Sequence, residues 1–121
     1  MNKVICNRLE MIHCSEVEGI FINEIRLKKN QTFLNLPLED IEYSSQYQFS
    51  DAGSILNETV TARIRYSPDL EFLEAALVYY VLRLHTNTST FLVGSTQYPA
   101  ILTYRNDKIQ VNLTFKASKP L

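Results

Sequence analysis

The sequence predicts an all-β or β-dominated fold: an antiparallel β-sandwich or barrel-like domain with at most one short helix, near residues 68–75. Two segments support this prediction most strongly, NETVTARIRY at 57–66 and KIQVNLTFKA at 108–117. In both, apolar residues alternate with polar ones in the two-residue period of a half-buried strand. Turn-forming residues between the apolar runs favour short antiparallel connections.

The N-terminal half adds three strand-like segments, VICNRLEMIHC at 4–14, GIFINEIRL at 19–27 and IEYSSQYQF at 41–49. The third alternates most clearly, and the aromatic residues on its odd-numbered face suit a pleated sheet better than a helix. SDAGS at 50–54 predicts the turn into the next strand, because Gly53 can adopt a positive φ.

The segment that follows is ambiguous between helix and strand. Ser67-Pro68 is typical of a helix start, and leucines then recur at helical spacing. VYYVLRL at 78–84 is instead β-branched and aromatic, so we expect a short helical turn at 68–75 and then a strand. HTNTST at 85–90 predicts a hairpin turn into a further strand.

TFLVGSTQYPAILTY at 90–104 predicts a corner between two strands. Gly94 ends the first strand, and Pro99, which has a fixed φ and no N–H to donate, suits the entry to the second. RND at 105–107 predicts one more hairpin turn, so the chain is expected to end in a four-stranded meander.

Residues 1–121 are expected to form one domain, since this length can enclose a sizeable core and no Pro-, Gly- or Ser-rich linker divides it. Eight residues of the predicted strands should be buried together in that core. They are Val60, Ile64, Tyr66, Leu82, Leu84, Val111, Leu113 and Phe115.

Charge and hydropathy narrow the range of partners. The formal net charge of -1 gives no field that would hold the chain on a phosphate backbone, so we expect no nucleic acid partner. The longest apolar run, AALVYYVL at 75–82, is far shorter than the roughly 20 residues that span a bilayer. With no visible signal peptide, we expect a chain that is cytoplasmic when synthesised and has no membrane partner.

No catalytic, cofactor-binding or metal-binding residue is predicted. Cys6 and Cys14 would lie about 26 Å apart on one straight strand, which favours two unpaired thiols. His13 and Cys14 are neighbours and would point to opposite faces of a strand, so they cannot share an ion. His85 is expected to make a local hydrogen bond at a strand end. Ser95 lacks the Gly-x-Ser-x-Gly context of an exposed nucleophile and is interpreted as a turn residue.

The C-terminal segment YYVLRLHTNTSTFLVGSTQYPAILTYRNDKIQVNLTFKASKPL resembles the C-terminal half of small β-rich structural proteins encoded in tailed-phage and prophage genomes, among the genes for tail and neck components. FLVGS, YPA and VNLTFKA within it account for the resemblance. The resemblance implies a virion component that acts through a rigid sheet and its edges, and it transfers no functional residue.

We therefore expect a non-enzymatic structural or assembly protein, a phage or prophage virion component of the tail or neck. Its partners would be copies of itself or other virion proteins, with no cofactor and no small-molecule ligand. Seven Tyr and six Phe offer adaptable contact surfaces, and aromatic residues are enriched at interfaces. The alternative is a small β-sandwich interaction or carbohydrate-binding module, which the same strands would serve equally well.

Overall fold

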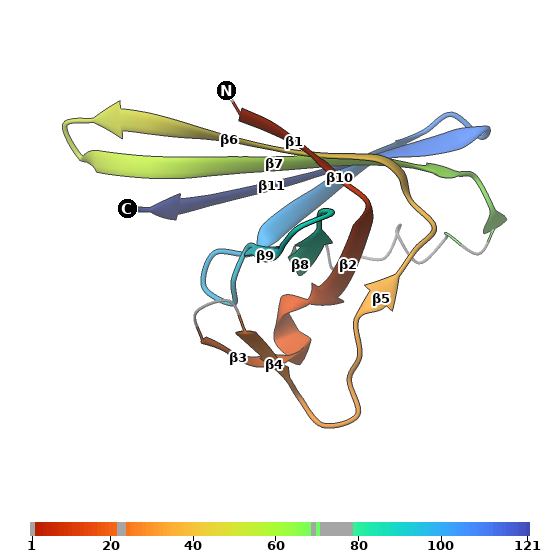
Figure 1. The fold of residues 1–121 in the computed structure, drawn as a ribbon, viewed down its shortest axis with the longest axis horizontal. Helices are drawn as coiled ribbons and strands as arrows, with labels where there is room; N and C mark the ends of the chain where they lie inside the picture. Colours follow the sequence, from red (N-terminus) through yellow and green to blue (C-terminus); the bar gives the residue numbers. More distant parts are fainter. Residues whose placement is uncertain (1, 22–23, 69, 71–78) are drawn as a thin grey trace.

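The computed structural model describes residues 2–21, 24–68, 70 and 79–121, and it confirms a β-dominated, antiparallel fold (Figure 1). A turn of 3-10 helix, η1 (Cys14–Glu16), separates two of the strands, and Pro68 and Leu70 also have 3-10 conformation. The strands are β1 (Asn2–Cys6), β2 (Arg8–His13), β3 (Val17–Phe21), β4 (Glu24–Leu27), β5 (Leu34–Asn35), β6 (Glu39–Ser50), β7 (Gly53–Arg65), β8 (Tyr79–His85), β9 (Thr90–Val93), β10 (Ala100–Asn106) and β11 (Gln110–Pro120).

The larger sheet runs in the order β1-β6-β7-β11-β10-β8-β2-β5, and β9 also pairs with β8. β1 and β2 are separated by Asn7 alone, yet they lie far apart in this order. The sheet must therefore fold over on itself. One layer contains β1, β6, β7, β11 and β10, and the other contains β8, β2, β9 and β5 (Figure 1).

The main core lies between these layers, where strands with two-residue alternation turn their apolar faces toward each other. Seven of the eight predicted core residues belong to it: Val60, Ile64, Leu82, Leu84, Val111, Leu113 and Phe115. The prediction for Tyr66 is wrong, since this side chain is 37% exposed. β7 ends at Arg65, so Tyr66 lies past the covered part of the sheet.

A second, smaller apolar cluster covers the opposite face of β2 and β8. Ile12, Val17 and Val81 are buried there against the hairpin of β3 and β4. The segment 19–27 is thus not one strand, because its two ends pair with each other around residues 22–23. The segment 4–14 is likewise two strands, and the chain passes from one layer to the other at Asn7.

The corner at 94–99 is confirmed. Gly94 has a φ of 84°, and a Cβ on it would lie 2.8 Å from the backbone nitrogen of Ala100, so both conformation and space require glycine. The backbone N–H of Ser95 donates to the carbonyl of Tyr98 at 3.0 Å. The turn predicted at 85–90 is also present, with Thr86 N–H bonded to Ser89 C=O at 2.8 Å.

Other predictions for this half need correction. The prediction of a four-stranded C-terminal meander is wrong, because β10 pairs with β11 and β8 rather than with β9. The last turn is shifted toward the C-terminus: β10 continues to Asn106, and the Asp107 carboxylate accepts the N–H groups of Ile109 and Gln110. The helical turn expected at 68–75 falls largely outside the described residues. Gly53, by contrast, has the expected positive φ in the turn between β6 and β7.

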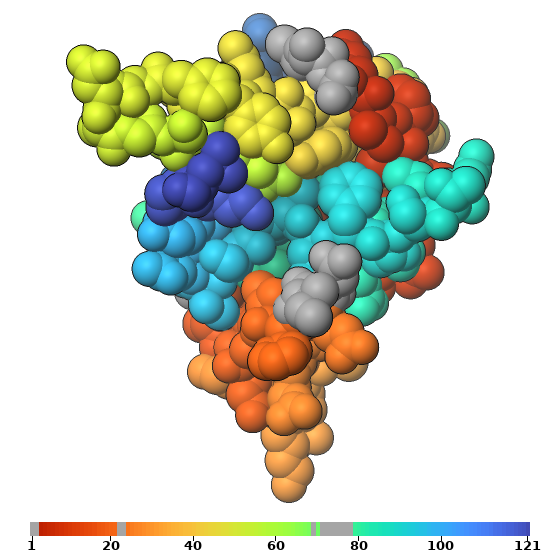
Figure 2. All heavy atoms as spheres, turned by 60° about the vertical axis from the view of Figure 1, so that its left-hand side comes forward, coloured from red at the N-terminus to blue at the C-terminus, as the bar shows by residue number. Residues whose placement is uncertain are grey.

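The hairpin of β6 and β7 extends beyond the two-layered body (Figure 1). β1 pairs only with residues 41–45 of β6, and β10 pairs with β11 only as far as Lys116. The parts beyond, residues 46–57 of β6 and β7 with residues 117–120 of β11, form a three-stranded projection that we call the arm. In Figure 2 its yellow-green tip stands out at the upper left of the molecule.

Candidate functional site

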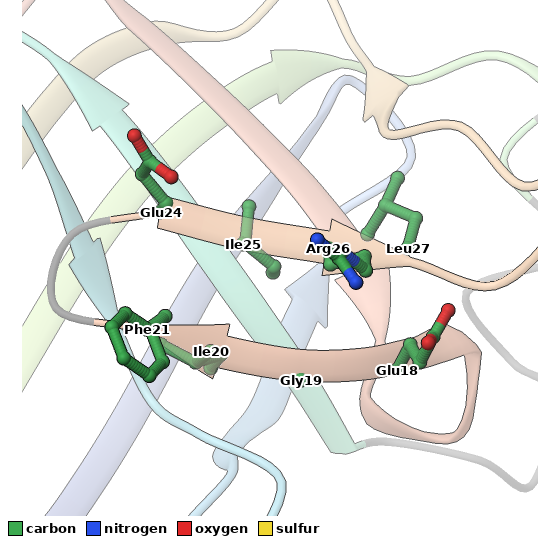
Figure 3. Close-up of a pocket in the computed structure, with 8 residues that line it drawn as sticks. All are labelled: Glu18, Gly19, Ile20, Phe21, Glu24, Ile25, Arg26 and Leu27. Carbon is green, nitrogen blue, oxygen red and sulfur yellow. The ribbon is translucent and has the colours of Figure 1, made fainter.

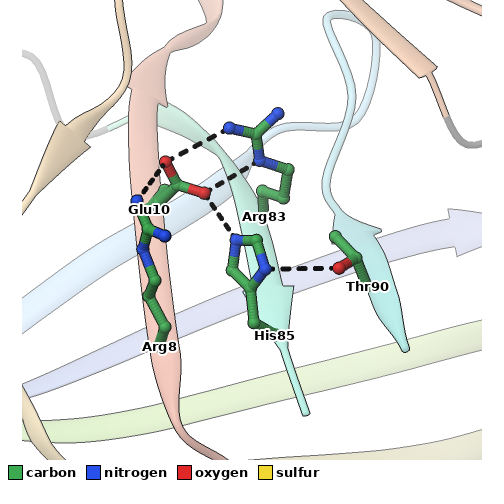
Figure 4. Close-up of polar contacts among 5 residues, drawn as sticks. All are labelled: Arg8, Glu10, Arg83, His85 and Thr90. Carbon is green, nitrogen blue, oxygen red and sulfur yellow. Dashed lines mark hydrogen bonds and ion pairs between the residues drawn. The ribbon is translucent and has the colours of Figure 1, made fainter. Parts of the chain in front are cut away.

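A buried carboxylate organises the outer face of β2 and β8 (Figure 4). Glu10 is only 5% exposed. It accepts two hydrogen bonds from the Arg83 guanidinium, at 2.9 and 3.2 Å, and pairs with Arg8 at 3.3 Å. Arg83 lies directly opposite Glu10 in the strand register and also stacks on Phe33, 4.1 Å from the ring centre. The cluster therefore ties neighbouring strands together through paired charges.

His85 extends this cluster to a third strand. Its Nε2 lies 2.5 Å from a Glu10 oxygen, and its Nδ1 lies 3.2 Å from the Thr90 hydroxyl of β9. The expected local hydrogen bond of His85 is thus present, but its carboxylate partner was not predicted. A hydroxyl, an imidazole and a carboxylate in series resemble a nucleophile, base and orienting group. Neither the cavity beside the hairpin of β3 and β4 nor the one beside Glu58 and Ser95 is lined by these three residues.

The same contacts set the ionisation of Glu10. Hydrogen bonds from Arg83 hold the pKa of this carboxyl at about 2, below its ordinary 4.5, and the contact with His85 acts in the same direction against the effect of burial. Glu10 is therefore ionised across the physiological range. A carboxylate so strongly paired is suited to holding strands together rather than to exchanging protons at neutral pH.

A cavity of about 750 Å³ lies along the hairpin of β3 and β4 (Figure 3). Its polar lining consists of the exposed Glu18, Glu24 and Arg26, and Phe21 beside them is 80% exposed. A ligand site normally has a few converging, desolvated polar groups, and these side chains are spread along an open ribbon.

The arm presents exposed aromatic side chains on a sheet face without a cover. In the register of β6, β7 and β11, the face that holds Val60 and Phe115 in the core continues outward to Tyr47 and Phe49. Val60 and Phe115 are fully buried, whereas Tyr47 is 55% and Phe49 75% exposed. Their rings lie 6.4 Å apart and 19° from parallel. An exposed aromatic surface on a projecting element is typical of a protein contact site.

A second buried carboxylate marks the boundary between body and arm. Glu58 is 7% exposed and accepts a 2.6 Å hydrogen bond from the Tyr43 hydroxyl, and no ion pair to it is found among the described residues. Burial, followed by this contact with Glu58, raises the pKa of Tyr43. Glu58 lines a cavity of about 180 Å³ together with Ser95, Tyr98 and Lys119. The base of the arm is therefore polar and partly open.

The residues that the sequence analysis considered for disulfide formation, metal binding or nucleophilic catalysis lie apart from the arm's aromatic face. Cys6 is buried, which raises the pKa of its thiol, and Cys14 is half-buried; both are free thiols. His13 stacks on Tyr80 with ring centres 4.6 Å apart. Ser95 is confirmed as a turn residue, since its hydroxyl accepts the Tyr98 N–H at 2.9 Å. Within the described ranges, no three His, Cys, Asp or Glu residues gather as a metal site.

Comparisons with known proteins identified no relative of this chain. No protein-family model, no curated protein and no solved structure matches the chain. The described part of the chain also has no helix long and apolar enough to cross a membrane.

Proposed function

We propose that this chain is a non-enzymatic assembly protein that acts through protein–protein contacts, and that the arm is its main contact surface. The observation that supports this most is the exposure of Tyr47 and Phe49 on a sheet face whose inner residues Val60 and Phe115 are fully buried. Aromatic side chains gain most from burial at an interface because they are large and rigid.

The setting we propose is the tail or neck of a phage or prophage virion. This part of the proposal depends on the resemblance of the C-terminal segment. The arm suits such a setting, since a rigid β-ribbon that extends from a closed core can reach a neighbouring subunit. β6 and β7 pair without interruption from Glu42 and Thr61 to the Ser50–Gly53 tip, which keeps the ribbon stiff.

The test is assembly in the presence of the proteins encoded beside this gene. The arm variant replaces Tyr47 and Phe49 by Ser, and the matched control replaces Ile5 and Ile109, which are 69% and 77% exposed on the body, by Ser. Electron microscopy and native mass spectrometry should show rings, tubes or stable complexes for the wild type and the control, and none for the arm variant. Equal assembly by both variants would contradict a role for the arm.

One observation favours the alternative, a carbohydrate-binding module. Two nearly parallel aromatic rings on an exposed sheet face can stack against successive sugar rings. Saturable binding of a soluble glycan, lost in the arm variant and retained in the control, would support that function. It would also replace the assembly proposal if no complex formed with any neighbouring gene product.

A further inference from the structure

The outer edge of β6 is open along the arm. β1 pairs with residues 41–45 of β6, and no described strand pairs with the remaining residues 46–50 on that side. Strand edges of this kind present N–H and C=O groups that a further strand can satisfy.

Hydrogen bonding on the other side of the arm shows which groups face this edge. The carbonyl of Ser54 accepts the N–H of Leu121 at 3.0 Å, so Ser54 directs its backbone groups toward β11 and away from β6. Phe49 lies directly opposite Ser54, and its own N–H and C=O must therefore point away from β7. Because these directions alternate along a strand, the backbone groups of Tyr47 also face the open edge.

The two edges of the arm differ in protection. The open edge of β11, residues 117–120, contains Lys119 and Pro120, and both residue types block strand addition in natural sheets. The open edge of β6, QYQFS at 46–50, contains neither a charge nor a proline. The unprotected edge can therefore accept a strand that the other would reject.

We propose that two copies of this chain pair antiparallel through residues 46–50 of β6, about a twofold axis at Gln48. This inference rests on the assembly function proposed above and names a second copy as the partner of the arm edge. An antiparallel pair that uses all five open residues on both strands places Gln48 opposite Gln48 and Tyr47 opposite Phe49 of the second copy. The two arms then form one continuous six-stranded sheet.

The side chains fit this arrangement on both faces. Directly opposed residues of an antiparallel pair share a face, so the two Tyr47 and two Phe49 rings form cross-strand aromatic pairs on the uncovered face. Gln46, Gln48 and Ser50 occupy the other face and bring no like charges together. The contact is isologous, which lets it close as a dimer.

Cysteine cross-linking tests the register. In Gln48→Cys, the new thiols face each other across the axis and should form an intermolecular disulfide under mild oxidation of the full-length chain. In Gln46→Cys, the two thiols would lie about 13 Å apart and should not cross-link. The wild type, with its native Cys6 and Cys14, gives the background. Cross-linking of both variants to the same extent, or of neither, would overturn the register.

Charge at the axis tests the contact itself. Gln48→Lys places two ammonium groups across the axis, whereas Ser118→Lys adds the same charge at the protected edge; both native side chains bond Asn57, at 3.2 and 2.6 Å. By sedimentation velocity at protein concentrations up to about 1 mM, we expect a dimer of the wild type and of Ser118→Lys, and a dimer at least about tenfold weaker for Gln48→Lys. A monomeric wild type, or equal effects of the two variants, would overturn the proposal.

Failure of this inference is distinguishable from failure of the assembly function. If the wild type stays monomeric but still forms complexes with neighbouring gene products that the Tyr47 and Phe49 variant cannot form, the edge contact is excluded and the assembly role stands. If neither copies nor neighbours associate, both are excluded.

Discussion

The two halves of the β6–β7 hairpin share one alternating pattern but have opposite surroundings. In the inner half, Val60 is fully buried against the second layer. In the outer half, Tyr47 and Phe49 continue the same face and are left in solvent. Alternation therefore determines which residues share a face, while the length of the neighbouring strands determines whether that face is covered. The change occurs at the half-buried Tyr43 and the buried Glu58, which are joined by a hydrogen bond at the edge of the apolar core.

The largest expected effect concerns the covered half. Replacing the fully buried Phe115 by Ala should lower the free energy of unfolding by about 3–5 kcal/mol, because the contacts of the ring are lost and a cavity remains. Urea unfolding measures the change, and Phe115→Leu offers a milder substitution if the Ala variant does not fold. A loss below about 1 kcal/mol would contradict a packed core at this end of the sheet.

The next effect is a pH dependence of the unfolding free energy that arises from Glu10 in the body and not from the arm. The pKa of Glu10 is about 2 in the folded chain and ordinarily 4.5, so its stabilisation is complete above pH 4.5 and is lost as the pH falls through about 2, up to about 3 kcal/mol. Unfolding measured between about pH 6 and about pH 2 should show this loss in the wild type and a flatter profile in Glu10→Gln. Asp51→Asn, at the exposed tip of the arm, should keep the wild-type profile. Parallel profiles for the wild type and Glu10→Gln would contradict the assignment.

A smaller effect is expected at the boundary. Tyr43→Phe removes the only hydrogen bond donor found for Glu58 among the described residues, at a cost of about 1–3 kcal/mol in unfolding free energy. Combining it with Glu58→Met should restore most of the loss, because no buried acceptor then lacks a donor. If the double variant is less stable than Tyr43→Phe, Glu58 has a further role in the folded chain.

The smallest effect is expected on the uncovered half. Phe49→Ala should change the unfolding free energy of the dilute chain by less than about 0.5 kcal/mol, since the ring is 75% exposed. The measurement is the same urea titration used for Phe115→Ala. A loss above about 1 kcal/mol would mean that the arm packs against something in the isolated chain, and the contrast between the two halves would fail.

The sequence predicted the parts of the fold that depend on local pattern. Alternation at 57–66 and 108–117 placed Val60, Leu113 and Phe115 in the core correctly, because each strand's own neighbours show the period. It failed at Tyr66, since a period does not show where the covering layer ends. The cluster around Glu10 was not found, because Glu10 and Arg83 meet only through pairing of strands distant in the chain. The one local feature of the sequence that pointed to this cluster was the presence of the polar residues Arg8 and Glu10 at alternate positions of a strand.

The passage of the chain between layers at Asn7 also affects the time course of folding. β1 pairs with β6, with Lys3 opposite Ser44, and β2 pairs with β8, with Arg8 opposite His85. When the chain is synthesised from β1 toward β11, β2 therefore has only the short β5 as a partner until residues 79–85 have been made. Folds dominated by such distant pairings close in roughly milliseconds to seconds rather than microseconds. Until β2 finds β8, Leu9 and Met11, both buried in the finished fold, remain in solvent, and this interval is when the nascent chain is most open to capture by another copy.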